Sequence, residues 1–90
     1  MAKVMIPAAL RDYTGGQRDI AVAAATVAQV LDDLARQHPR LRRHLYSEHG
    51  SLRSYVNVFV NQDEIRSLDG LDTEVGEADT LYIVPSIAGG

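Results

Sequence analysis

The most informative absence in this 90-residue sequence is cysteine, which does not occur at all. Without a thiol the chain forms no disulfide, offers no thiolate nucleophile, and cannot ligate an iron–sulfur cluster or a cysteine-bound zinc ion. The three histidines, His38, His44 and His49, are not at the helical spacing typical of zinc ligands. We therefore expect no metal site and no cofactor.

Lysine is nearly absent as well, since Lys3 is the single lysine and the formal net charge is −3. A surface that neutralises phosphates is normally basic, so this balance argues against general nucleic-acid binding. No apolar run reaches the length of a membrane span, and the N-terminus lacks the basic region and apolar core of a secretory signal. We expect a cytoplasmic protein with no nucleic-acid or membrane partner.

The composition is that of an ordinary globular domain, with 46% hydrophobic and 23% charged residues. Ninety residues suffice for one modest core but not for a two-domain enzyme with a deep cleft. We expect a single domain over residues 1–84 and a flexible tail over residues 85–90.

Alternation of apolar and polar residues predicts four strands, over residues 3–6, 19–23, 55–60 and 79–84. The side chains expected to face the core are Val4, Ile6, Ile20, Val22, Val56, Val58, Val60, Leu81 and Ile83. Glycines in Thr14-Gly15-Gly16-Gln17 permit the positive φ of a tight hairpin turn between the first two strands. A phosphate-binding loop is the alternative, but the glycine-lysine pair and the following helix that it needs are missing.

One amphipathic helix is predicted after Thr26, an N-cap that forms a capping box with Gln29. Its apolar stripe consists of Val27, Val30, Leu31 and Leu34. Pro39 ends the helix, because the residue before proline is displaced from the α region.

A basic cluster follows the helix in this otherwise acidic chain. It could dock an acidic partner, or it could be a solvated turn above Leu41, Leu45 and Tyr46, and we favour the solvated turn. Its members are Arg36, His38, Arg40, Arg42, Arg43 and His44.

The segment between the third long strand and the last one is predicted to be irregular. Residues 61–64 turn the chain into a short strand around Ile65, and residues 67–78 form an acidic connector. Leu68, Leu71 and Val75 are the expected anchors of this connector to the core. The order strand, strand, helix, strand, short strand, strand predicts an α+β ubiquitin-like β-grasp, with a mixed sheet of four to five strands around one main helix.

The given sequence closes on Gly89-Gly90, two residues that contribute no side chain to a core. A thin peptide with a terminal carboxylate can enter a narrow active site in which any Cβ would clash. That carboxylate reacts only after activation, most simply as an acyl adenylate. An ordinary disordered terminus is the alternative.

The end of the chain resembles the tails of the ThiS/MoaD-type ubiquitin-like sulfur carriers, in which a strand and a proline precede a Gly-Gly terminus. The similarity extends over nearly the whole chain and is greatest to the carriers of actinobacterial cysteine biosynthesis. The segments that support it are Leu81-Tyr82-Ile83-Val84-Pro85, Ala88-Gly89-Gly90, Ile6-Pro7 with Leu10-Arg11, Thr14-Gly15-Gly16-Gln17 and Val56-Asn57-Val58-Phe59-Val60-Asn61.

This resemblance implies that an E1-like adenylating and sulfurtransferase enzyme activates the Gly90 carboxylate, which then becomes a thiocarboxylate. Ile87, Ala88 and Gly89 would enter the partner enzymes. The favoured acceptor is a cysteine synthase-like enzyme, after which a metallopeptidase trims the adduct. Thiamine thiazole, molybdopterin and sulfur-containing natural products remain open as the destination of the sulfur.

Phe59, Tyr82 and Val84 are expected to form an exposed apolar patch near the root of the tail, if the last strand lies beside the strand over residues 55–60. In the resembling families this is the face on which the E1-like enzyme docks. The alternative is that these side chains merely cover the sheet.

No set of residues supports catalysis by this chain itself. The acid pairs Asp32 with Asp33 and Glu74 with Glu77 are interpreted as solvated charge, and no histidine has an identifiable nucleophile to serve. We therefore expect a co-substrate, not an enzyme. A protein modifier joined through Gly90 to lysines of its targets is the main alternative, and an inert β-grasp interaction module is a third.

Overall fold

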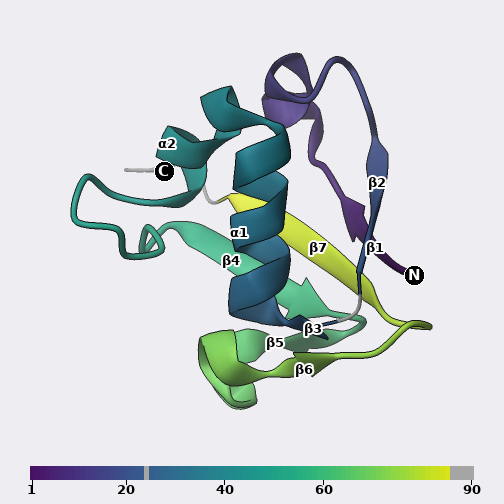
Figure 1. Ribbon diagram of the computed structural model, residues 1–90. Coiled ribbons are helices and arrows are strands. Elements are labelled where there is room, and N and C mark those ends of the chain that lie inside the picture. The colour runs from purple at the N-terminus through teal and green to yellow at the C-terminus, as the bar shows by residue number, and fades with distance from the viewer. Residues whose placement is uncertain (24, 86–90) are drawn as a thin grey trace.

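A mixed five-stranded sheet runs through the computed structural model, which describes residues 1–23 and 25–85 (Figure 1). Its order is β2-β1-β7-β4-β5, so β7 is the central strand. β1 and β7 are parallel, whereas all other neighbours are antiparallel. The strands are β1 (Ala2–Met5), β2 (Asp19–Val22), β4 (Val56–Val60), β5 (Asp63–Glu64) and β7 (Thr80–Pro85).

One face of the sheet carries the core, as the alternation of the sequence predicted. All nine side chains expected to face inward are buried, among them Val56 and Leu81, which are both fully inaccessible to solvent. Successive side chains of a strand point to opposite faces, so the same alternation leaves Phe59 and Tyr82 on the outer face.

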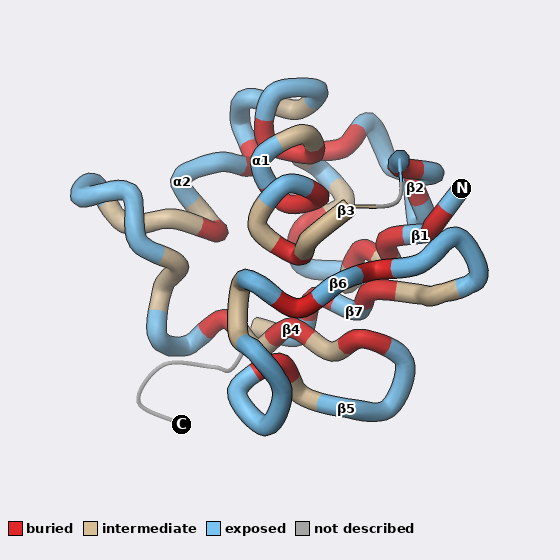
Figure 2. Tube along the Cα trace, turned by 60° about the horizontal axis from the view of Figure 1, so that its bottom comes forward, coloured by how far each residue is buried: buried red, intermediate tan, exposed pale blue. Residues whose placement is uncertain are grey.

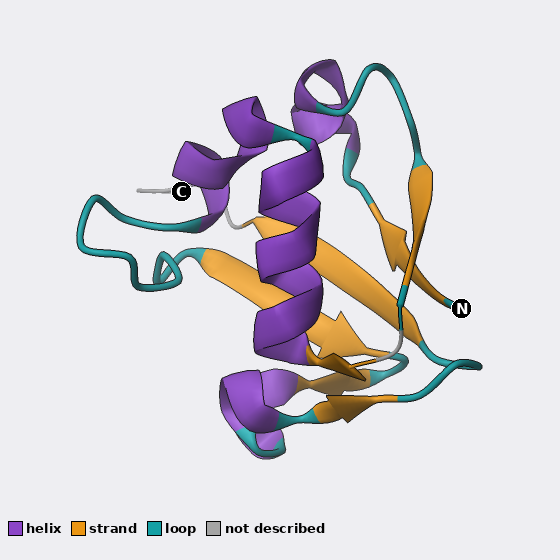
Figure 3. Cartoon of the chain, viewed as in Figure 1, coloured by secondary structure: helices purple, strands orange, loops and turns teal. Residues whose placement is uncertain are grey.

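The helix α1 (Val27–Gln37) crosses the inner face of the sheet (Figure 3). The predicted capping box is present: the Gln29 amide donates to the Thr26 hydroxyl at 3.3 Å, and the Thr26 amide donates to Gln29 Oε1 at 3.1 Å. The predicted stripe is buried to 1% exposure or less, and the helix ends before Pro39. The α+β β-grasp prediction of one main helix against a mixed sheet is thus confirmed. None of the helices within residues 1–23 and 25–85 is long and apolar enough to cross a bilayer.

The connection between β1 and β2 differs from the predicted tight hairpin. A 3-10 helix, η1 (Ala8–Tyr13), precedes the two glycines and lengthens the connection. Gly15 and Gly16 do adopt positive φ, at 66° and 83°, but they reverse the chain after η1, where the Gly16 amide donates to the Arg11 carbonyl at 2.8 Å. β1 and β2 do pair antiparallel, as a hairpin requires, so only the tightness of the predicted turn was wrong. The six-residue η1 is too short to leave a periodic pattern in the sequence.

The acidic connector contains more regular structure than predicted. β6 (Glu74–Val75) pairs with β3 (Ala25–Thr26) in a separate two-stranded sheet, and the short helices η3 (Ile65–Ser67) and η4 (Gly70–Asp72) lie before it. Ile65 begins η3, so the short strand expected around it lies just earlier, in β5.

Two of the three predicted anchors of the connector pack against the core. Val75 is buried and Leu71 is partly buried against the core cluster. Leu68 is 42% exposed, so its assignment as an anchor was wrong. An apolar residue in a short irregular segment carries no information on the direction of its side chain.

After α1 the chain forms η2 (Pro39–Leu41) and α2 (Arg42–Leu45), which close the core at the far end of the helix. Leu41 and Leu45 are fully buried, while Arg42 and Arg43 are exposed. Figure 2 shows exposed residues along the outer loops and buried residues on α1 and on the strands.

Candidate functional site

The apolar patch predicted on the outer face of the sheet is assembled by the ladder between β4 and β7. Phe59 lies directly opposite Tyr82, and Asn57 lies opposite Val84. Tyr82 and Val84 are 40% and 45% exposed, and Phe59 is half-buried. Together they line an open groove of about 530 Å³. The structure therefore brings the three predicted patch residues onto one face beside the end of β7.

Two polar residues that sequence reasoning did not assign to the site, Asn61 and Gln62, complete the lining of this groove. Asn61 has a φ of 57° and lies in the turn between β4 and β5. Its Nδ2 donates to Asp79 Oδ1 at 3.0 Å, and its Oδ1 accepts from the Thr80 amide at 3.1 Å. The only sequence signal for this role was an asparagine at an expected turn, since asparagine side chains often hydrogen-bond the backbone there.

The carboxylate of Asp79 is held on both oxygens, because the Gly76 amide donates to Oδ2 at 2.8 Å. Both hydrogen bonds lower the pKa of Asp79 below its usual value, and the bond from Asn61 has the larger effect. These bonds join the β4–β5 turn to the start of β7 and fix one rim of the groove.

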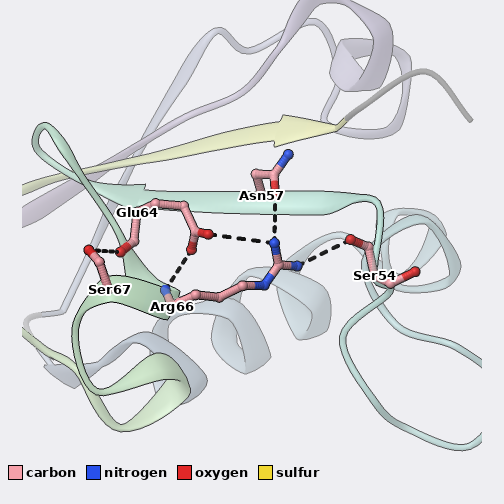
Figure 4. Close-up of polar contacts among 5 residues, drawn as sticks. All are labelled: Ser54, Asn57, Glu64, Arg66 and Ser67. Atoms are coloured by element: carbon pink, nitrogen blue, oxygen red, sulfur yellow. Dashed lines mark hydrogen bonds and ion pairs between the residues drawn. The ribbon is translucent and has the colours of Figure 1, made fainter. Parts of the chain in front are cut away.

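A network around Arg66 supports the same outer face next to the patch (Figure 4). Arg66 Nη1 donates to Asn57 Oδ1 at 3.0 Å, and its Nη2 donates to the Ser54 carbonyl at 3.1 Å. The Arg66 amide donates to Glu64 Oε2 at 2.6 Å, and the Arg66 and Glu64 side chains form an ion pair at 3.5 Å. Because Asn57 lies two residues before Phe59 on β4, this network braces the strand that carries the patch. No local pattern in the sequence singles out Arg66.

The residues predicted to carry the chemistry, Gly90 with Ile87, Ala88 and Gly89, lie outside the described residues. The last described residue is Pro85, which belongs to β7 and is in register with Val56. The strand thus continues one residue into the segment that we assigned to the tail.

The acidic pairs considered for catalysis are placed differently by the structure. Asp32 and Asp33 of α1 both form ion pairs with Arg36, at 3.7 Å and 3.6 Å, with side chains that are all substantially exposed. Glu74 belongs to β6, where Thr26 is its partner. Within residues 1–23 and 25–85 no group of three or more His, Asp or Glu side chains is arranged to hold a metal ion.

Comparison with known proteins connects this geometry to one family. The model of the ThiS family matches residues 4–90. The chain is 35% identical over 89 residues to the sulfur carrier protein CysO of Mycobacterium tuberculosis, covering 97% of this chain and 96% of CysO.

Two further relatives extend the comparison. The chain is 36% identical over 66 residues to the small archaeal modifier protein 3 of Haloferax volcanii, covering 73% of this chain and 71% of that protein. Among solved structures, a chain of the Amycolatopsis orientalis BexX/CysO complex superposes with a TM-score of 0.89, at 38% identity and with full coverage of both chains.

Proposed function

This chain belongs to the ThiS family, and on that premise we propose that it carries sulfur as a thiocarboxylate on Gly90. As a member of that family it is a sulfur carrier and not an enzyme. The chemistry is therefore performed on it by partner proteins, and its own residues contribute recognition and access.

The loading reaction has two steps on an E1-like adenylating and sulfurtransferase enzyme. A carboxylate oxygen of Gly90 attacks the α-phosphorus of ATP, and pyrophosphate leaves. Hydrosulfide then attacks the carbonyl carbon of the acyl adenylate and gives its proton to solvent, while AMP leaves with the former carboxylate oxygen. The product is a thiocarboxylate, and neither step changes an oxidation state.

The observation that carries this proposal is the extent of the family match, which continues through Ile87, Ala88 and Gly89 to Gly90. Glycine has no Cβ, so a Gly-Gly segment enters a narrow channel that other residues would block. The groove lined by Phe59, Tyr82 and Val84 borders the end of β7. We assign that groove to docking of the E1-like enzyme, because exposed apolar patches of this kind mark partner surfaces.

Cysteine biosynthesis is the favoured destination of the sulfur, because the relatives that match nearly the full length of the chain include CysO proteins. The acceptor would be a cysteine synthase-like enzyme, and a metallopeptidase would release the product from the tail. Thiamine thiazole, molybdopterin and sulfur-containing natural products are the other destinations of the same thiocarboxylate chemistry. A cytoplasmic location is part of the same proposal.

The test is the intact mass of the full chain after incubation with ATP, sulfide and the adenylating enzyme of the source organism. The expected product is heavier by the difference between sulfur and oxygen, and fragmentation places that difference on Gly90. Omission of ATP is the control. An unchanged mass in the complete mixture would contradict the proposal.

A protein modifier is the second candidate function, and the observation that favours it is the similarity to an archaeal modifier protein. In this case an amine, not hydrosulfide, captures the adenylated Gly90. Lys3 is the single lysine of the chain, so self-linked chains could grow only through Lys3 or the α-amino group. Protein isolated from its source distinguishes the two functions: a carrier appears as a thiocarboxylate, and a modifier appears as a ladder of conjugates.

A further inference from the structure

A second groove, of about 370 Å³, lies on a different part of the molecule and has positively charged walls. Arg42 and Arg43 line it from α2. Arg53 lines it from the connection between α2 and β4. Tyr46 contributes an aromatic ring, and Glu48 is the single acid in the lining. None of these residues lines the apolar groove of β4 and β7.

Hydrogen bonds to backbone carbonyls of α2 hold Arg53 beside this helix. The Arg53 amide donates to the Leu45 carbonyl at 2.8 Å, and Arg53 Nε donates to the Arg43 carbonyl at 2.7 Å. An isolated β-bridge between Tyr46 and Leu52 closes the loop between them. The Arg53 side chain is therefore held against the backbone of Arg43, and both arginines line the same groove.

Two of these charges have no acidic partner within residues 1–23 and 25–85. The ion pairs among the described residues involve Arg36, Arg42 and Arg66, and none reaches Arg43 or Arg53 within 4.0 Å. Burial has the largest effect on the pKa of the nearby His44, which it lowers. Arg43 and Arg53 lower this pKa further, as expected of positive charges close to the imidazole.

The charge is concentrated in this segment. Residues 39–55 contain four arginines and one glutamate, a net charge of +3, while the remainder of the chain has a net charge of −6. The chain as a whole is thus strongly polarised.

The basic groove also lies near the end of β7. The Val56 amide donates to the Arg53 carbonyl at 3.0 Å, and Val56 pairs with Pro85, the last described residue. Figure 1 shows α2 and its loop on the side of the molecule where β4 begins and β7 ends. A protein that takes up the residues after Pro85 would meet this groove.

We propose that the basic groove docks an acidic surface of the enzyme that accepts the sulfur. This inference rests on the proposed function, in which the carrier meets two enzymes in turn, one that loads Gly90 and one that unloads it. The apolar groove serves the loading enzyme, and the basic groove, which shares none of its residues, serves the acceptor. Complementary charge would steer the acceptor toward the end of β7.

An acidic protein surface fits this groove better than a nucleic acid does. A long polyanion would extend beyond the groove and meet the remainder of the chain, which carries six net negative charges. A protein surface can place its acids opposite Arg43 and Arg53 alone.

The experiment measures loading and unloading separately, with the adenylating enzyme and the sulfur-accepting enzyme of the source organism. The variants are Arg43→Glu and Arg53→Glu, and the matched control is Arg18→Glu, which removes the same charge from an exposed position remote from α2 in sequence. We expect kcat/KM for unloading to fall about five- to tenfold in each groove variant through KM, with loading unchanged. Raised salt should reduce unloading of the wild-type protein and have less effect on Arg43→Glu.

Arg43 makes no side-chain hydrogen bond to a described residue, so Arg43→Glu should fold even if Arg53→Glu does not, and circular dichroism verifies this. Unloading of Arg43→Glu at the rate of Arg18→Glu would overturn the inference, as would an equal loss in loading. Binding of single-stranded oligothymidylate by the wild-type protein but not by Arg43→Glu would assign the groove to nucleic acid and also overturn it. Failure of the wild-type chain to acquire sulfur would instead overturn the proposed function, and this inference with it.

Discussion

Phe59 of β4 lies directly opposite Tyr82 of β7, with both side chains on the face of the sheet that α1 leaves uncovered. Cross-strand aromatic pairs contribute about 0.2–1 kcal/mol to a sheet, which is little for two large side chains. Exposed aromatic residues are instead typical of the centre of a protein interface. The pair is therefore a candidate for recognition more than for stability.

The first prediction concerns this pair. Tyr82→Ala should lower kcat/KM for adenylation of the chain by about tenfold or more, because truncation of an aromatic anchor costs an interface about 2 kcal/mol. Pyrophosphate exchange with the adenylating enzyme measures this. Leu68→Ala is the matched control, since Leu68 is 42% exposed and Tyr82 is 40% exposed. Equal activity of the two variants would remove the apolar groove from the docking surface.

The second prediction separates the chemistry of the tail from the stability of the domain. Deletion of Gly90 should abolish loading, because the next carboxylate is one residue too short for the same active site. The buried core of the described residues extends no further along the chain than Ile83, so the melting temperature should stay the same. Thermal unfolding and intact mass are measured on one sample. A large fall in melting temperature would show that the residues after Pro85 stabilise the fold.

The third prediction is the converse change, Leu81→Ala. Leu81 is fully buried near the start of β7, the central strand of the sheet, and its truncation leaves a cavity between α1 and the sheet. The free energy of unfolding should fall by about 2–5 kcal/mol. Urea denaturation measures it, and Tyr82→Ala on the same strand serves as the exposed control. A loss below about 1 kcal/mol would mean that the core collapses around the missing side chain.

The fourth prediction tests the capping box of α1. Thr26→Ala removes the hydroxyl that accepts from the Gln29 amide, and it should destabilise the protein by about 1 kcal/mol. Thr26→Ser retains the hydroxyl and should lose much less. Chemical denaturation distinguishes the two variants. Equal losses would indicate that the methyl group of Thr26, and not its hydrogen bond, provides the stabilisation.

The sequence predicted those parts of the fold that repeat a pattern over several residues. Alternation located β1, β2, β4 and β7, and the Thr26–Gln29 spacing located the start of α1. The position of the apolar patch was also predicted, because it depends only on which side chains of β4 and β7 face outward and on the two strands being neighbours.

Short and non-local features could not be predicted in this way. The β3–β6 pairing involves two residues on each side, too few for any periodicity. Arg53 Nε donates to the carbonyl of Arg43, ten positions earlier in the sequence, and the local sequence contains nothing that specifies this contact. The basic cluster of the sequence, which shares Arg42 and Arg43 with the basic groove, is therefore interpreted as a solvated turn, because only the fold brings Arg53 to it.

The last prediction concerns His44, whose ring stacks on Tyr13 with centroids 4.2 Å apart. Its Nε2 is buried and has no hydrogen-bond partner among the described residues. Burial, with smaller contributions from Arg43 and Arg53, lowers the pKa of His44 below its ordinary 6.5. The unfolded chain then binds a proton more readily than the folded one, so stability should be complete above pH 6.5 and should be lost as the pH falls toward the folded pKa.

His44→Phe preserves a stacking ring that cannot titrate, so the loss of stability just below pH 6.5 should be shallower in this variant than in the wild-type protein. Urea denaturation at a series of pH values gives the two slopes. His49→Gln is the control for the replacement of a histidine at an exposed position. If His44→Phe and the wild-type protein lose stability in parallel, protonation of His44 is not what opposes folding in acid.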